Sequence, residues 1–140
     1  MAWIDRLSRV AVVLACLALI ACATSGVPAE TAERYVHVVF IWLKSPGDAA
    51  QIDRLIETTR TLKSIPGVRE VRVGRAVPSD RPQVDDSFDV GLYLLFDSRT
   101  DLEAYQHNPI HQAAVRDTLA PLAARYLIYD FVDARAACAR

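Results

Sequence analysis

The sequence lacks most of the short motifs that identify common functional classes. Its 140 residues include 5 glycines and 3 cysteines, and they form neither a glycine-rich phosphate loop nor a CxxC pair. HExxH and GxSxG are also missing, which excludes the usual motifs of zinc proteases and serine hydrolases. The 16 Lys and Arg nearly balance the 17 Asp and Glu, so the charge gives no basis for nucleic-acid binding. The length allows one domain, and the composition indicates neither disorder nor a disulfide scaffold.

The apolar residues are concentrated at the N-terminus. Hydrophobic residues make up 52% of the chain but 17 of its first 21 positions, and residues 10–23 form an unbroken apolar run. This run is too short to cross a bilayer, which needs about 20 residues in a helix. Arg6 and Arg9 precede it, as is typical of a secretory signal peptide. We therefore expect a signal peptide at residues 1–21, a flexible tether at 22–33, a globular domain at 34–133 and a tail at 134–140.

The end of the apolar run carries a more specific signal. The segment from Leu19 to Cys22 resembles the bacterial lipobox, in which the cysteine is acylated and becomes the first mature residue. The resemblance implies lipidation of Cys22, export to the cell envelope and a membrane anchor. Ala23 in the following position favours the periplasmic side of the outer membrane if the host is Gram-negative. The alternative is ordinary cleavage close by, with Cys22 incidental.

The rest of the chain alternates between strand and helix patterns. Runs of β-branched and aromatic residues predict four strands, at residues 35–44, 68–77, 88–96 and 126–132. Asp48 and Ser98 are candidate caps, followed by apolar residues at helical spacing. The first helix is predicted to end at about residue 64. Asn108-Pro109 interrupts the second, which resumes to about residue 118, and Pro121 closes it. The order β-α-β-β-α-β predicts an α+β, ferredoxin-like protomer.

The first, third and last predicted strands are apolar on both faces. In the first, one face carries Val36, Val38, Phe40 and Trp42, and the other carries Val39, Ile41 and Leu43. Since both helices cover the same face in this fold, the opposite face would expose a larger apolar patch than monomers usually tolerate. A second copy packed sheet to sheet would bury it. The sequence therefore predicts a homodimer.

His37 and Asp130 are polar residues in the middle of predicted strands. His37 shares its side of the strand with Val39 and Ile41, where a polar ring must find a partner or line a cavity. Asp130 lies between two aromatic residues of the last strand. We interpret Asp130 as a hydrogen-bonded structural residue, while for His37 both a structural and a functional role stay open.

Residues 105–111 concentrate polar side chains around the predicted helix break. Tyr105 and Asn108 are three residues apart and can share a helix face, and the break turns His111 toward the sheet beside Tyr105. One interpretation of this arrangement is a pocket with acid–base groups, and the residues by themselves leave a second one open. The alternative is structural, with Asn108 as a cap, Tyr105 in the core and the histidines at the surface.

Several segments together resemble the stress-responsive A/B barrel (Dabb) family. They are found in order between residues 34 and 133, at 37–40, 65–68, 88–92, 96–98, 105–111 and 129–131. The resemblance implies a ferredoxin-like protomer that dimerises into an α/β barrel. One plant branch of the family contains a polyketide cyclase that performs an intramolecular aldol condensation. By resemblance its catalytic tyrosine and histidine correspond to Tyr105 and His111, and a further pocket histidine corresponds to His37. Asn108 replaces the first histidine of the family's His-Pro-x-His segment.

This resemblance implies a division of roles in a pocket between helices and sheet. His111 would act as general base, Tyr105 would donate to a developing enolate oxygen, and His37 would orient the substrate. We expect Val39, Ile41 and Asn108 to line the pocket. We expect no cofactor, and no metal, because two imidazoles without a third ligand make a poor site.

The leading functional prediction is a protein that is anchored to the cell envelope and binds a small apolar or aromatic ligand. The family resemblance implies a link to stress responses. One alternative is an acid–base enzyme of the cyclase, lyase or isomerase kind that uses Tyr105 and His111. Another is a structural dimer without catalysis. A ligand in a pocket holding His37 and His111 would favour the first two, and a pocket filled by side chains would favour the third.

Overall fold

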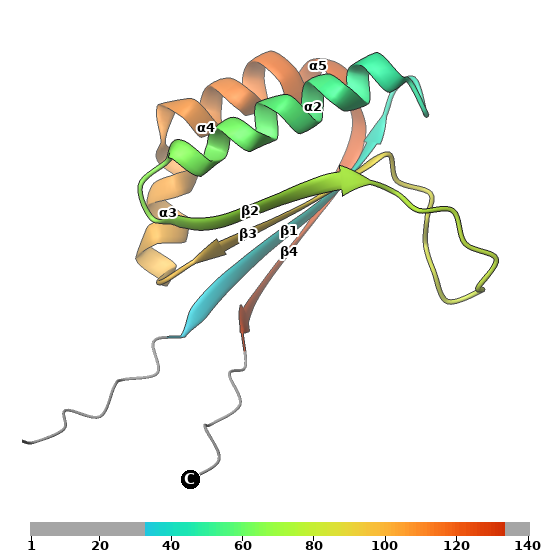
Figure 1. The fold of residues 1–140 in the computed structure, drawn as a ribbon. Helices are drawn as coiled ribbons and strands as arrows, with labels where there is room; N and C mark the ends of the chain where they lie inside the picture. The colour runs from blue at the N-terminus through green and yellow to red at the C-terminus, as the bar shows by residue number, and fades with distance from the viewer. Residues whose placement is uncertain (1–32, 134–140) are drawn as a thin grey trace, which may run out of the picture. The chain divides into compact units, whose positions relative to one another are not determined.

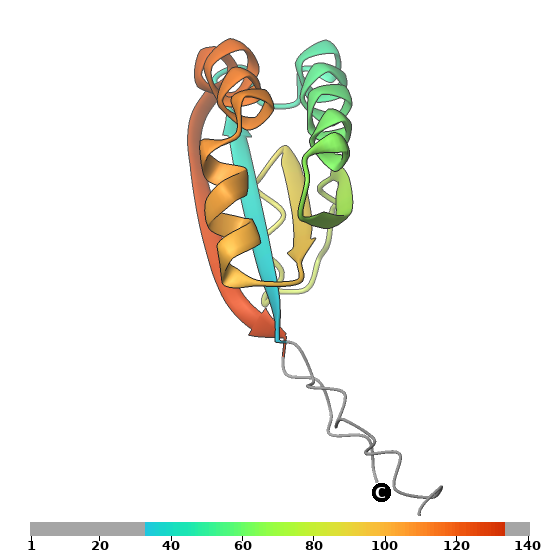
Figure 2. The same cartoon turned by 90° about the vertical axis from the view of Figure 1, so that its left-hand side faces the viewer.

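The described part of the chain forms one antiparallel sheet with helices on one side. The computed structural model describes residues 33–133, and the predicted signal peptide, Cys22 and the tail lie outside this range. Within it, the sheet has the order β2-β3-β1-β4. Its strands are β1 (Arg34–Leu43), β2 (Val68–Arg75), β3 (Val90–Phe96) and β4 (Ala123–Asp133). Helix α2 (Ala49–Thr61) and helices α3 (Arg99–His107), α4 (Pro109–Ala114) and α5 (Ala120–Leu122) cover the same face (Figures 1 and 2). The predicted βαββαβ order is confirmed.

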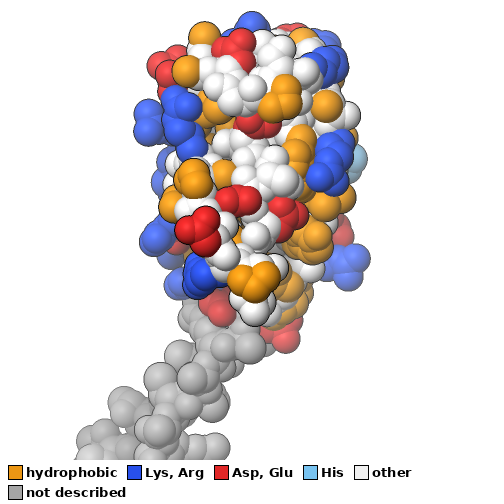
Figure 3. Space-filling model, turned by 90° about the vertical axis from the view of Figure 1, so that its right-hand side faces the viewer, with side chains coloured by type: hydrophobic (Ala, Val, Ile, Leu, Met, Phe, Trp, Pro, Cys, Tyr) orange, Lys and Arg blue, Asp and Glu red, His pale blue; other side chains and the backbone are white. Residues whose placement is uncertain are grey.

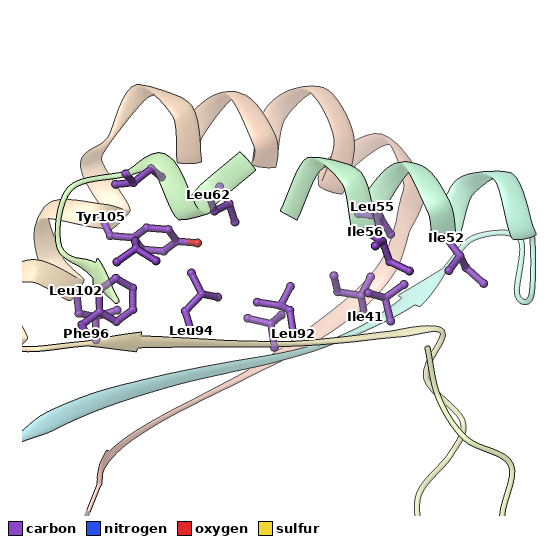
Figure 4. Close-up of a cluster of buried hydrophobic side chains, with 14 of the residues drawn as sticks. Ile41, Ile52, Leu55, Ile56, Leu62, Leu92, Leu94, Phe96, Leu102 and Tyr105 are labelled. Carbon is purple, nitrogen blue, oxygen red and sulfur yellow. The ribbon is translucent and has the colours of Figure 1, made fainter. Parts of the chain in front are cut away.

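Helix α2 is placed by its cap and by an apolar stripe that faces the sheet. The Asp48 side chain accepts a hydrogen bond from the Gln51 backbone N–H at 3.0 Å, as predicted from the sequence. The last turn tightens into a 3-10 helix, Leu62–Ser64. The buried stripe packs on the central strands in the core of the protomer (Figure 4), and consists of Ile52, Leu55, Ile56 and Leu62.

The second helical region is interrupted where the sequence predicts, but it extends further. Ser98 caps α3 by accepting from the Asp101 backbone N–H at 3.1 Å. Asn108 caps α4 by accepting from the Ile110 N–H at 2.9 Å. After α4 the chain continues as a π-helix, Val115–Leu119, and then as α5, which contains Pro121. Proline is tolerated in a first helical turn because its missing N–H has no helical partner there. The predicted end at residue 118 is therefore too early, and β4 begins at Ala123 rather than at 126.

Strands β2 and β3 are shorter than predicted because the chain between them leaves the sheet. The Phe88 ring packs against Phe40, with 4.8 Å between ring centroids, instead of continuing the strand. The Asp89 carboxylate accepts from the backbone N–H of Leu43 at 2.8 Å and from that of Gly47 at 2.6 Å. These contacts tie the start of β3 to the turn after β1.

The sheet face opposite the helices carries a row of exposed apolar side chains. On β1 this face holds Val38 and Phe40, whose partners on β4 are Tyr129 and Leu127. Leu127, Tyr129 and Phe131 are 42%, 54% and 52% exposed in the protomer. On β1 the two apolar faces lie where predicted, with one face on the core and the other open. On β4 the helix-facing side is exposed as well, since Ile128, the partner of Val39, is 50% exposed.

Charged side chains of both signs are interspersed over the face shown in Figure 3. Surface ion pairs of the described residues include Arg75 with Asp53 and Arg99 with Glu103. Such exposed pairs contribute little to stability. Among residues 33–133, no helix is long and apolar enough to span a membrane.

Candidate functional site

A cavity of about 350 Å³ lies between the sheet and the helices. Strand β1 contributes His37, Val39 and Ile41, and the helical regions contribute Tyr105, His111 and apolar residues from α2 to the π-helix. Its volume falls in the range of small-molecule sites. The residues that line it are uncharged apart from the two titratable histidines. The site therefore suits a neutral, largely apolar molecule with few polar atoms.

Tyr105 forms the inner wall of this cavity. Its side chain is 2% exposed, and its ring packs against Phe96 with 5.2 Å between centroids. Figure 4 shows its hydroxyl pointing into the layer between Leu62 and Leu94. Burial raises the pKa of Tyr105 well above its ordinary value. The phenol therefore stays protonated and can donate a hydrogen bond to a bound molecule.

His111 lies against Tyr105, with 4.3 Å between the ring centroids. Its Nδ1 lies 3.1 Å from the Gln106 carbonyl oxygen, which can only accept, so Nδ1 carries the proton. In the neutral ring Nε2 is then the free acceptor. Burial lowers the pKa of His111, outweighing the Gln106 hydrogen bond that raises it, and nearby His37 lowers it further. The imidazole is thus held as a neutral base at pH 7.

His37 is buried beside Tyr105 and close to His111. It is 6% exposed, and its ring meets Tyr105 edge-on with 6.0 Å between centroids. Its Nδ1 lies 2.6 Å from a carboxylate oxygen of Asp130, the residue paired with it across β1 and β4. Asp130 is therefore hydrogen-bonded, as the sequence predicts. What the sequence did not reveal is that its partner is a cavity histidine, because that depends on the register of the two strands.

Most of the predicted site residues meet in the cavity, and one does not. His37, Tyr105, His111, Val39 and Ile41 all line it. Asn108 is not among the lining residues, and its side chain caps α4 instead. Its position between α3 and α4 sets the direction in which His111 leaves the helix break. Sequence reasoning also passed over Gln106, whose backbone carbonyl orients His111.

The described residues show no group that would hold a metal ion. Between residues 33 and 133, no three His, Cys, Asp or Glu side chains gather closely enough to do so. His37 and His111 have Asp130 and the Gln106 carbonyl as their Nδ1 partners.

Fold and cavity together define a ferredoxin-like α+β protein with an uncharged pocket between its sheet and its helices. The model of the stress responsive A/B barrel domain, Dabb, matches residues 36–133. The chain belongs to this family, as the resemblance indicated. None of the curated proteins compared with the chain matches it.

Solved structures share the fold at low sequence identity. A Dabb family protein from Mesorhizobium loti is 24% identical, with a TM-score of 0.59 over 71% of this chain and 95% of its own. A dimeric ferredoxin-like protein of unknown function from Thermobifida fusca is 20% identical, with a TM-score of 0.59 over 72% and 92%. Hydroxynitrile lyase from Passiflora edulis is 21% identical, with a TM-score of 0.65 over 75% and 97%.

Proposed function

We propose that this protein binds a small uncharged aromatic or apolar molecule in the cavity between its sheet and its helices. The observation that carries the proposal is the cavity itself, about 350 Å³ with Tyr105 and two histidines in an otherwise largely apolar wall. Protein interiors are otherwise close-packed, so a protein with only a structural role would be expected to fill this space with side chains. Polar groups at one end fix the orientation of a bound molecule, and the apolar wall supplies most of the affinity.

Filling the cavity tests this proposal. Binding of p-cresol to the full chain is followed by calorimetry and by NMR shifts of the cavity residues. Ala114 lines the cavity, so Ala114→Phe is expected to weaken binding at least about 10-fold by occupying the space. Ala104→Phe on the exposed side of α3 is the control and leaves binding unchanged. Equal binding by both variants contradicts the proposal.

A second candidate function is acid–base catalysis in the same cavity. The contact between His111 and Tyr105 favours it, since Nε2 of His111 is a free acceptor beside a protonated phenol. From a C–H next to a carbonyl, His111 would remove the proton, and the C–H electron pair would form the enolate, with its charge on the carbonyl oxygen. From a hydroxynitrile, His111 would remove the O–H proton, the O–H pair would form the carbonyl, and cyanide would leave with the electrons of the broken C–C bond. In both cases the Tyr105 hydroxyl would donate a hydrogen bond to the substrate oxygen. The hydroxynitrile lyase from Passiflora edulis shares the fold.

Activity is tested with an aromatic hydroxynitrile and an aromatic β-diketone. An acid–base enzyme shows a pH–rate profile with a histidine-like midpoint, and the rate falls at least about 100-fold in His111→Ala and Tyr105→Phe. If the wild type binds p-cresol but converts neither compound, the ligand-binding proposal is kept. Catalysis of these two reactions by His111 and Tyr105 is then contradicted.

We also propose that the protein works as a homodimer joined through the open sheet face. Leu127, Tyr129 and Phe131 on this face are about half exposed in the protomer, and their burial against a second copy would remove a continuous apolar patch from water. The similar protein from Thermobifida fusca is described as dimeric.

Finally, we propose that the chain is exported and anchored to the envelope membrane through a lipidated Cys22, on the periplasmic side of the outer membrane in a Gram-negative host. The lipobox-like segment supports this. The test is Cys22→Ser, or globomycin treatment, followed by membrane fractionation. Release of the variant from the membrane and a change in gel mobility are expected. Unchanged mobility and fractionation contradict the anchor.

A further inference from the structure

Asp130 lies on the outer side of the cavity wall. It does not line the cavity that holds Tyr105 and His111, but a second hollow that also contains Tyr35, Arg99 and Glu103. Its side chain is 46% exposed, whereas that of His37 is 7% exposed. The half-exposed Asp130 carboxylate thus accepts a hydrogen bond from the buried His37 imidazole, with 2.6 Å between Oδ1 and Nδ1.

This contact determines what His37 offers to the cavity. An ionised carboxylate can only accept a hydrogen bond, so Nδ1 of His37 must donate, and the neutral ring has its proton there. The Nε2 nitrogen at the other edge of the ring then has a free lone pair. The Gln106 carbonyl imposes the same tautomer on His111. Both histidines therefore present Nε2 to the cavity as an acceptor. Asp130 fixes this tautomer in His37, and the Gln106 carbonyl fixes it in His111.

The polar groups that face this pair come from two helices, α3 and α4. On the cavity side, His37 faces Tyr105 of α3 and His111 of α4. On the outer side, Asp130 shares its hollow with Arg99 and Glu103 of α3, which pair with each other at 2.9 Å. The hydrogen bond of Asp130 to His37 is thus separate from the ion pair beside it.

We propose that Asp130 is a positioning residue that fixes His37 as a hydrogen-bond acceptor and so makes the cavity select molecules with a hydroxyl donor. The proposal rests on the ligand-binding function above and adds a ligand class, uncharged aromatic compounds with a free hydroxyl. The His37 nitrogen accepts from that hydroxyl, and a compound of the same shape with a methyl group in its place leaves the nitrogen unpaired.

The test changes Asp130 without changing any residue of the cavity wall. In Asp130→Asn the amide can rotate and donate to Nδ1, which places the ring proton on Nε2. Glu103→Gln is the matched control, because it removes one negative charge from the same hollow without touching His37. Nitrogen-15 NMR of the histidines in the full chain reports the tautomer, and calorimetry compares p-cresol with its isostere p-xylene.

The wild type and Glu103→Gln are expected to show the Nδ1–H tautomer of His37 and a preference for p-cresol. Asp130→Asn is expected to shift the tautomer toward Nε2–H and to reduce that preference about 3- to 10-fold, the effect of one hydrogen bond. An Nε2–H tautomer in the wild type overturns the proposal, as does an unchanged tautomer or preference in Asp130→Asn. If neither compound binds the wild type, the ligand-binding function fails, while the tautomers still decide the role of Asp130.

Discussion

At the scale of single residues, Tyr105 combines packing with chemistry. Its ring contacts Phe96 in the core and His111 and His37 in the cavity. The hydroxyl faces the cavity, whereas the ring holds the core together (Figure 4). Mutations can therefore separate the two contributions.

We expect Tyr105→Phe to change the free energy of unfolding by less than about 1 kcal/mol, because the ring remains in place. Tyr105→Ala should cost about 3–5 kcal/mol, the usual cost of removing a buried aromatic ring. Urea unfolding measures both variants, and p-cresol binding is compared for the wild type and Tyr105→Phe. Equal destabilisation by the two substitutions would contradict a hydroxyl that serves the cavity rather than the fold.

His111 predicts a pH dependence of stability. Burial lowers its pKa in the folded state below the ordinary value of 6.5, so the unfolded chain binds this proton more readily. The contribution of His111 to stability is therefore full above pH 6.5 and is lost as the pH falls from there toward the folded-state pKa. We expect urea unfolding at pH 5.5 and 7.5 to show a larger difference for the wild type than for His111→Gln. An equal difference in both proteins refutes a lowered pKa.

At the scale of elements, two glycines with positive φ lie in the connections that precede and follow α2. Gly47 precedes α2 with φ +74°, and Gly67 follows it with φ +86°. A Cβ at Gly47 would meet nothing within 4 Å, while one at Gly67 would lie 2.8 Å from Cβ of Asp101 in the first turn of α3. The Gly67 turn therefore determines how closely the connection after α2 approaches α3.

This difference makes a matched pair of substitutions. Gly47→Ala should cost about 1–2 kcal/mol, the strain of an L-residue in the left-handed region. Gly67→Ala adds the clash with Asp101 to the same strain and should cost at least about 1 kcal/mol more. The free energies of unfolding in urea give the comparison. Similar costs for both variants would show that the contact with Asp101 relaxes freely.

At the scale of the whole molecule, the open sheet face is where we propose the dimer contact. Phe131→Glu places a charge within the proposed dimer contact and should weaken association at least about 100-fold. Val77→Glu is the control, since Val77 is 77% exposed and lies outside the sheet. Analytical ultracentrifugation over a range of concentrations measures the masses. A monomeric wild type, or a Phe131→Glu variant that stays dimeric, contradicts the homodimer.

Local signals predicted most of the elements correctly. Asp48, Ser98 and Asn108 cap helices within one residue of the expected positions, because caps act through backbone groups two or three residues away. One error arises where a distant contact overrides local preference, since Phe88 leaves its predicted strand for Phe40. The other is local, since Pro121 lies in the first turn of α5 instead of ending the helical region before it.

The sequence by itself determined the order of the elements, their caps and the two apolar faces of the strands. All of these depend on residues a few positions apart, whose periodicity and backbone hydrogen bonds act locally. Only the tertiary structure decided that Asp130 of β4 meets His37 of β1, and that His37 lines the cavity while Asp130 lines the outer hollow beside it. That pairing spans 93 positions and depends on strand register, where a shift of one residue would turn Asp130 to the opposite face.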